Sequence, residues 1–99
     1  MNNETYLNHP TFGLLFRVCQ VEEKQELFTT LYAQRLFFIV TNNQGKLSFE
    51  TISRSDARLL VENRLRKLRR SSLIDEYEQL FKIHKKTFWT LNIEHWNTY

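Results

Sequence analysis

The chain has 99 residues, which is enough for one ordinary domain or for a very small domain with an appendage. Hydrophobic residues make up 41% of it, with two Gly and one Pro, so the composition excludes a disordered chain. One cysteine excludes an internal disulfide, and the longest apolar run, Leu36 to Val40, is far shorter than the ~20 residues that span a bilayer. Because the start carries no basic or apolar leader, we expect a cytoplasmic protein without membrane contact.

The net charge of +3 is divided unevenly along the chain. Residues 1–52 carry four basic and five acidic groups, whereas residues 53–99 carry ten basic and six acidic groups. Such an asymmetry predicts two modules with different surfaces. The hydrophobic period changes at the same place, so we expect a sheet domain at 1–52 and a helical hairpin with a tail at 53–99.

The first half of the chain alternates with period two, which is typical of β-strands. Leu36 to Val40 is apolar on both faces, and residues with turn chemistry separate the extended runs, as at Asn42 to Gly45. Four or five short strands in about fifty residues predict a small, strongly bent sheet. Closure into a barrel would remove its exposed edges.

After Ile52 the period becomes helical. Ser53 and Asp56 have the spacing of a capping box, and residues 54–70 place an apolar arc on one helix face. Ser72 and Asp75 repeat the cap spacing and predict a second helix over 73–89, packed against the first as an antiparallel hairpin. The predicted apolar arcs contain Ala57, Leu60, Val61, Leu65 and Leu68 in the first helix and Leu73, Ile74, Tyr77, Leu80, Phe81, His84 and Phe88 in the second.

No constellation of residues indicates catalysis. The two glycines form no phosphate loop, and one Cys with three separated His cannot make a usual zinc site. Cys19 lies in an alternating strand pattern that predicts a buried thiol. His84 lies in the middle of an apolar helical arc, where a histidine satisfied by a neighbouring group is the simplest interpretation. We therefore expect no enzyme activity.

The basic run Arg64 to Arg70 is the strongest electrostatic feature. A solvated helix face explains Arg66, Arg69 and Arg70, since cations are favoured in the last turn of a helix. Arg64 falls inside the apolar arc and must extend outward or pair with a carboxylate. The alternative is a small nucleic-acid-binding protein that uses the helix 54–70, because several cations in a short run can neutralise phosphates.

Aromatic residues exceed what a sheet of this size can bury. Part of this set must point outward, and exposed Tyr beside Arg is typical of protein-binding hot spots. The segment from Tyr32 to Leu36 offers that mixture, whereas Phe28, Leu31 and Phe37 suit a core.

Three segments make the chain recognisable: YLNHPTFGLLF at 6–16, ELFTTLYAQRLFF at 26–38 and ENRLRKLRR at 62–70. They closely resemble the PipX family of PII-interacting proteins, and the resemblance is nearly colinear from Glu4 to Trp89. It implies an α+β fold in which a small bent five-stranded antiparallel Tudor-like sheet, related to SH3-like barrels, precedes a C-terminal two-helix hairpin.

The resemblance also implies a function. PipX-like proteins use the Tudor-like domain to bind either the trimeric signalling protein PII or the transcription factor NtcA in its 2-oxoglutarate-bound form. They need no cofactor, and no direct sequence-specific contact with DNA is expected. Tyr32 matches the family's tyrosine for the NtcA contact, and the full set of expected partner-binding residues is Glu4, Tyr6, Tyr32, Arg35, Leu36 and Phe38.

Overall fold

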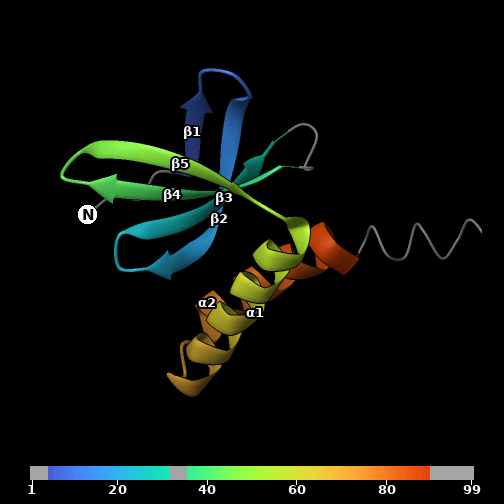
Figure 1. Cartoon of the computed structure of the whole chain (residues 1–99). Coiled ribbons are helices and arrows are strands. Elements are labelled where there is room, and N and C mark those ends of the chain that lie inside the picture. Colours follow the sequence, from blue (N-terminus) through green and yellow to red (C-terminus); the bar gives the residue numbers. More distant parts are fainter. Residues whose placement is uncertain (1–4, 32–35, 90–99) are drawn as a thin grey trace, which may run out of the picture.

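Five antiparallel strands follow one another in a single sheet, and two helices close the chain (Figure 1). The computed structural model describes residues 5–31 and 36–89. The strands are β1 (Tyr6–His9), β2 (Gly13–Glu22), β3 (Gln25–Thr30), β4 (Phe37–Asn43) and β5 (Lys46–Ile52). The helices are α1 (Arg54–Arg70) and α2 (Ile74–His84), and the π-helical turn η1 (Lys85–Trp89) continues α2. The predicted α+β class and the curled five-stranded sheet are confirmed.

β2 gives the sheet its curl. Its first part pairs with β1, and Leu15 to Glu22 pair with β3. This second pairing has two shifts of register, one between Arg17 and Cys19 and one between Gln20 and Glu22. Such bulges bend a strand and increase its twist. β1 therefore turns away from the plane of β4 and β5, and the sheet becomes a half-barrel (Figure 1).

A two-residue turn joins β4 to β5. Asn43 pairs with Lys46, and the residues between them, Gln44 and Gly45, have φ of 54° and 86°. Positive φ at both central positions is the mark of a type I′ turn, whose twist suits a β-hairpin. The side-chain oxygen of Asn42 accepts a hydrogen bond of 2.9 Å from the Gly45 amide and holds the turn closed.

The sheet carries a hydrophobic core on each of its two faces. The barrel core lies in the concave interior and consists of Leu15, Phe28, Phe38 and Val40, with Leu7 and Phe49 at its margin. The interface core lies between the sheet and the helices. From the strands it contains Val18, Cys19, Leu27, Phe37 and Ile39, and from the helices and η1 it contains Ala57, Val61, Leu65, Leu68, Leu80 and Phe88. Neighbouring residues of β3 and β4 alternate between the two cores, which explains why both strands are apolar on both faces.

α1 begins and ends at well-defined caps. Ser53 accepts a hydrogen bond of 3.0 Å from the Asp56 amide, which confirms the first predicted cap. The helix ends in a Schellman motif, in which the amide of Ser72 bonds to the carbonyl of Arg69 and that of Leu73 to the carbonyl of Leu68. The second predicted cap is wrong, because Ser72 has φ of 60° and α2 begins without a side-chain cap.

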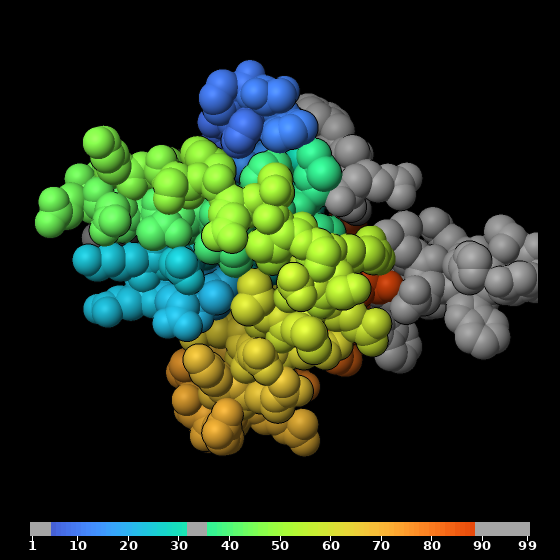
Figure 2. All heavy atoms as spheres, in the orientation of Figure 1, coloured from blue at the N-terminus to red at the C-terminus, as the bar shows by residue number. Residues whose placement is uncertain are grey.

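α2 packs against α1 with only part of its predicted apolar arc. Leu80, His84 and Phe88 are buried, and Phe37 of β4 stacks on Phe88 with ring centroids 5.7 Å apart. Three other members of the arc, Leu73, Ile74 and Phe81, are exposed. The far end of the hairpin, in yellow to orange, projects beyond the sheet in Figure 2.

Candidate partner-binding surface

Three large apolar side chains of the strand half are exposed near β1 and the chain before β4. Tyr6 in β1 is 49% exposed, Phe12 in the β1–β2 turn is 44% exposed and Leu36 is 36% exposed. We call Tyr6, Phe12 and Leu36 the sheet rim. Apolar groups that remain in contact with water in a folded protein are candidates for burial against another protein.

His9 and Phe38 hold Phe12 in place. The Nδ1 atom of His9 accepts hydrogen bonds from the amides of Thr11 and Phe12, at 3.0 and 3.2 Å, and so fixes the β1–β2 turn. The Phe12 ring lies 5.0 Å from the His9 ring and 5.6 Å from the Phe38 ring, measured between centroids. Phe12 is therefore held in place by a packed cluster although it faces solvent.

The sheet fixes both ends of the segment 32–35. The Leu31 amide bonds to the Leu14 carbonyl in β2 at 3.1 Å. The Leu36 carbonyl accepts from the Thr30 amide at 3.1 Å and from the Thr29 hydroxyl at 2.9 Å. Since Leu14 also pairs with Asn8 of β1, Leu31 is one strand away from the strand that carries Tyr6.

The structure separates the six residues expected to bind partners into three groups. Glu4, Tyr32 and Arg35 lie outside the described residues. Tyr6 and Leu36 are exposed, as a contact with a partner requires. Phe38 is 1% exposed and belongs to the barrel core, so its ring supports Phe12 and does not offer a surface of its own.

Two supporting residues, His9 and Phe12, were not singled out by sequence reasoning. The close spacing of His9, Pro10 and Phe12 was the available signal, since a short turn brings the side chains at its two ends together.

Cys19 lies at the boundary between the sheet and the helices. Burial raises the pKa of its thiol to about 12, although Arg64 and Arg17 act in the opposite direction. The thiol therefore stays protonated at neutral pH and does not act as a nucleophile. Within 5–31 and 36–89, no group of three His, Cys, Asp or Glu side chains could hold a metal ion, and no helix is long and apolar enough to cross a membrane.

The cations near the end of α1 follow the predicted solvated face. Arg66, Lys67, Arg69 and Arg70 are exposed, and three of them lie in the last turn, where the helix dipole favours positive charge. Arg64 differs from them because it is half-buried and lines a groove between the helices and β2.

Comparison with protein families adds a separate line of evidence. The family model described as PipX, PII-interacting protein X, matches residues 3–88. The chain belongs to the PipX family. The match begins before β1 and reaches into η1, so PipX membership covers the sheet and the hairpin together. A comparison with curated proteins, taken one by one, found no match.

Proposed function

We propose that the chain is a non-enzymatic adaptor of nitrogen-responsive transcription, which binds either PII or the 2-oxoglutarate-bound form of NtcA. The observation that carries this proposal is the match over residues 3–88 to a family described as PII-interacting. The resemblance of the segment around Tyr32 to the PipX family supports NtcA as the second partner.

The sheet rim offers a surface suited to this role. Tyr6, Phe12 and Leu36 are exposed on strands and turns that the barrel core holds rigid. A preformed apolar surface loses little conformational entropy when a partner covers it. Tyr32 and Arg35 lie in the sequence between Leu31 and Leu36, and they would add an aromatic ring and a forked hydrogen-bond donor.

Use of one surface by both partners makes their binding mutually exclusive. PII and NtcA would then compete for the adaptor, and the level of 2-oxoglutarate would decide which complex forms. Neither partner requires a reaction at the adaptor. The protonated thiol of Cys19 agrees with a protein that works by contact alone.

Single substitutions in the segment 32–35 test the proposal. We expect Tyr32→Ala to weaken binding to NtcA at least about tenfold, because truncation of a hot-spot residue costs about 2 kcal/mol. Arg35→Ala should weaken binding to PII by a similar factor. Calorimetry with each partner, with and without 2-oxoglutarate, measures both effects, and a thermal melt checks the fold.

Leu59→Ala is the matched control, because Leu59 is 55% exposed but lies on α1, outside the sheet. It should leave both affinities unchanged. Unchanged affinities in Tyr32→Ala and Arg35→Ala would remove the segment 32–35 from the interface. Sub-micromolar, sequence-specific binding of the isolated protein to a DNA duplex, abolished by Arg66→Ala with Arg69→Ala, would instead support the nucleic-acid-binding alternative.

A further inference from the structure

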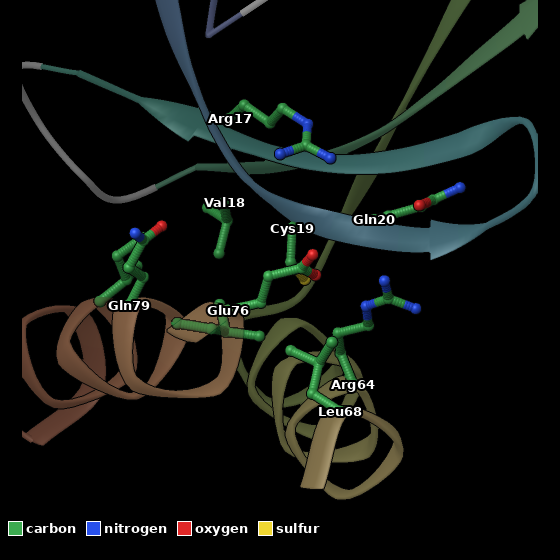
Figure 3. Close-up of a pocket in the computed structure, with 10 residues that line it drawn as sticks. Arg17, Val18, Cys19, Gln20, Arg64, Leu68, Glu76 and Gln79 are labelled. Atoms are coloured by element: carbon green, nitrogen blue, oxygen red, sulfur yellow. The ribbon is translucent and has the colours of Figure 1, made fainter. Parts of the chain in front are cut away.

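A groove of about 390 Å³ lies between β2 and the two helices (Figure 3). Val18 and Cys19 approach it from the strand, Arg64 and Leu68 from α1, and Glu76 and Leu80 are among the residues from α2. The volume falls in the range of small-molecule sites, about 300–1,000 Å³. None of the three sheet-rim residues lines the groove.

The base of the groove is apolar. Val18, Cys19, Leu68 and Leu80 are each about 5% exposed or less and belong to the interface core. The thiol of Cys19 is neutral at physiological pH and adds no charge there. The small exposed surface of this base can therefore accept an apolar group without leaving a buried charge unpaired.

Two opposite charges flank the apolar base. Arg64 comes from α1 and Glu76 from α2, and in Figure 3 both side chains extend toward β2. Among the described residues neither forms an ion pair, although Arg64 is half-buried. Arg17 differs, because its Nε atom is already paired with Glu26 at 2.8 Å. The groove thus presents one uncompensated cation and one uncompensated anion.

We propose that this groove binds a small α-amino acid with an apolar side chain. Its carboxylate would pair with the Arg64 guanidinium, which offers a planar fork of donors. Its ammonium group would pair with the Glu76 carboxylate, and its side chain would cover the apolar base. A ligand with only a negative charge would pair with Arg64 but would be repelled by Glu76. A ligand with only a positive charge would pair with Glu76 but would be repelled by Arg64. A zwitterion satisfies both groups.

An NMR titration of the whole chain with three probes of similar size tests this inference. L-leucine carries both charges, 4-methylpentanoate lacks the ammonium group and 3-methylbutylamine lacks the carboxylate. We expect leucine to shift the backbone amides of Cys19, Leu68 and Leu80, with an affinity of about millimolar for so small a ligand. The two singly charged probes should bind at least about tenfold more weakly, which corresponds to one lost ion pair.

Two variants identify the charges. Arg64→Gln should weaken the binding of leucine at least about tenfold. Glu76→Gln should remove the preference for leucine over 4-methylpentanoate. Arg66→Gln is the matched control, because Arg66 lies on the same helix outside the groove and should leave the titration unchanged.

Three results would overturn the inference. One is the absence of shifts at Cys19, Leu68 and Leu80 at leucine concentrations up to about fifty times the expected millimolar Kd. Another is an equal response to leucine in Arg64→Gln and in the unaltered chain. The third is equal loss of thermal stability in Arg64→Gln and Glu76→Gln with no change in leucine binding, which would show that the two groups pair only with each other in solution.

Discussion

The barrel core and the interface core occupy opposite faces of one sheet but differ in how they are closed. The barrel core is built from strands alone, and the curl of the sheet encloses it. The interface core takes its residues from the sheet, from both helices and from η1. The apolar residues of the concave face are thus buried by the bending of the sheet itself. Those of the other face are buried by the helices that cover it.

This difference explains the apparent excess of aromatic residues. A barrel that closed on itself would need apolar side chains on its interior face only. β4 places Phe38 in the barrel core and Phe37 in the interface core, against Phe88. The hairpin therefore does for the outer face what a second sheet does in a β-sandwich. In the strand half, the exposed apolar residues of the sheet rim are candidates for partner contact.

The largest effect is expected from a charge placed in the interface core. Leu65 is 8% exposed, so Leu65→Asp would bury a carboxylate without a partner. We expect the free energy of unfolding to fall by on the order of several kcal/mol, as in other disruptions of a protein core. We expect the hairpin to lose its packing on β2, β3 and β4. Hydrogen exchange should show lost protection in α1 and α2 before the β3 and β4 amides.

Leu59→Asp is the control for this variant, since Leu59 lies on the same helix and is 55% exposed. It should change stability by less than about 0.5 kcal/mol. Simultaneous loss of protection in the helices and in the strands of Leu65→Asp would show that the two cores unfold as one cooperative unit.

A smaller and opposite effect is expected at the link between the helices. Ser72 has φ of 60°, a left-handed conformation that costs a non-glycine residue about 1 kcal/mol. Ser72→Gly should therefore stabilise the protein by up to about 1 kcal/mol in a chemical denaturation experiment. The neighbouring Ser71 has φ of −87°, so Ser71→Gly should destabilise it instead. Stabilisation by both variants would contradict the Schellman geometry.

The smallest effect is expected from an ion pair at the rim of the interface core. Glu62 in α1 bonds to Arg58 at 3.0 Å and lies 3.2 Å from the Nε2 atom of His84 in α2. The hydrogen bond from Arg58 is the largest cause that lowers the pKa of the Glu62 carboxyl, and the contact with His84 acts in the same direction. A carboxyl with a lowered folded-state pKa adds stability above its unfolded pKa and loses it as the pH falls.

Glu62→Gln should therefore flatten the loss of stability between about pH 5 and pH 3. The side chain of Glu62 is 30% exposed and partly screened by solvent, so we expect a difference below about 1 kcal/mol. Thermal melts across this pH range measure it. Identical slopes for Glu62→Gln and the unaltered chain would mean that the pair does not stabilise the hairpin.

The sequence predicts most of the fold because its period changes sharply. The limits of α1 follow from Ser53 at one end and Ser71 at the other, and both agree with the structure. The burial of Phe28 and Phe37 was predicted correctly, since strands that are apolar on both faces must be covered on both. The order of the strands needed no long-range information, because each strand pairs with the next along the chain.

Three features could not be read from the pattern. Ser72 has the spacing of a cap, but the Schellman motif uses its backbone in a conformation that glycine usually provides. The arc of α2 is wider than the surface α1 offers, so nothing in the sequence says that Phe81 faces solvent while Leu80 is buried. Arg64 was correctly identified as out of place, but the position of Glu76 across the groove depends on how the hairpin packs on β2.

The turn between β4 and β5 has a consequence for how the sheet finds its alignment. Phe37, Phe38, Ile39 and Val40 are all buried, so a slip of one residue would exchange one large apolar side chain for another on both faces. Side-chain burial in this strand therefore discriminates poorly between the native pairing and its shifted neighbour. The discrimination falls to the type I′ geometry at Gln44 and Gly45, which permits one pairing and excludes the shifted one. Accuracy of folding in the most hydrophobic strand thus depends on its most polar end.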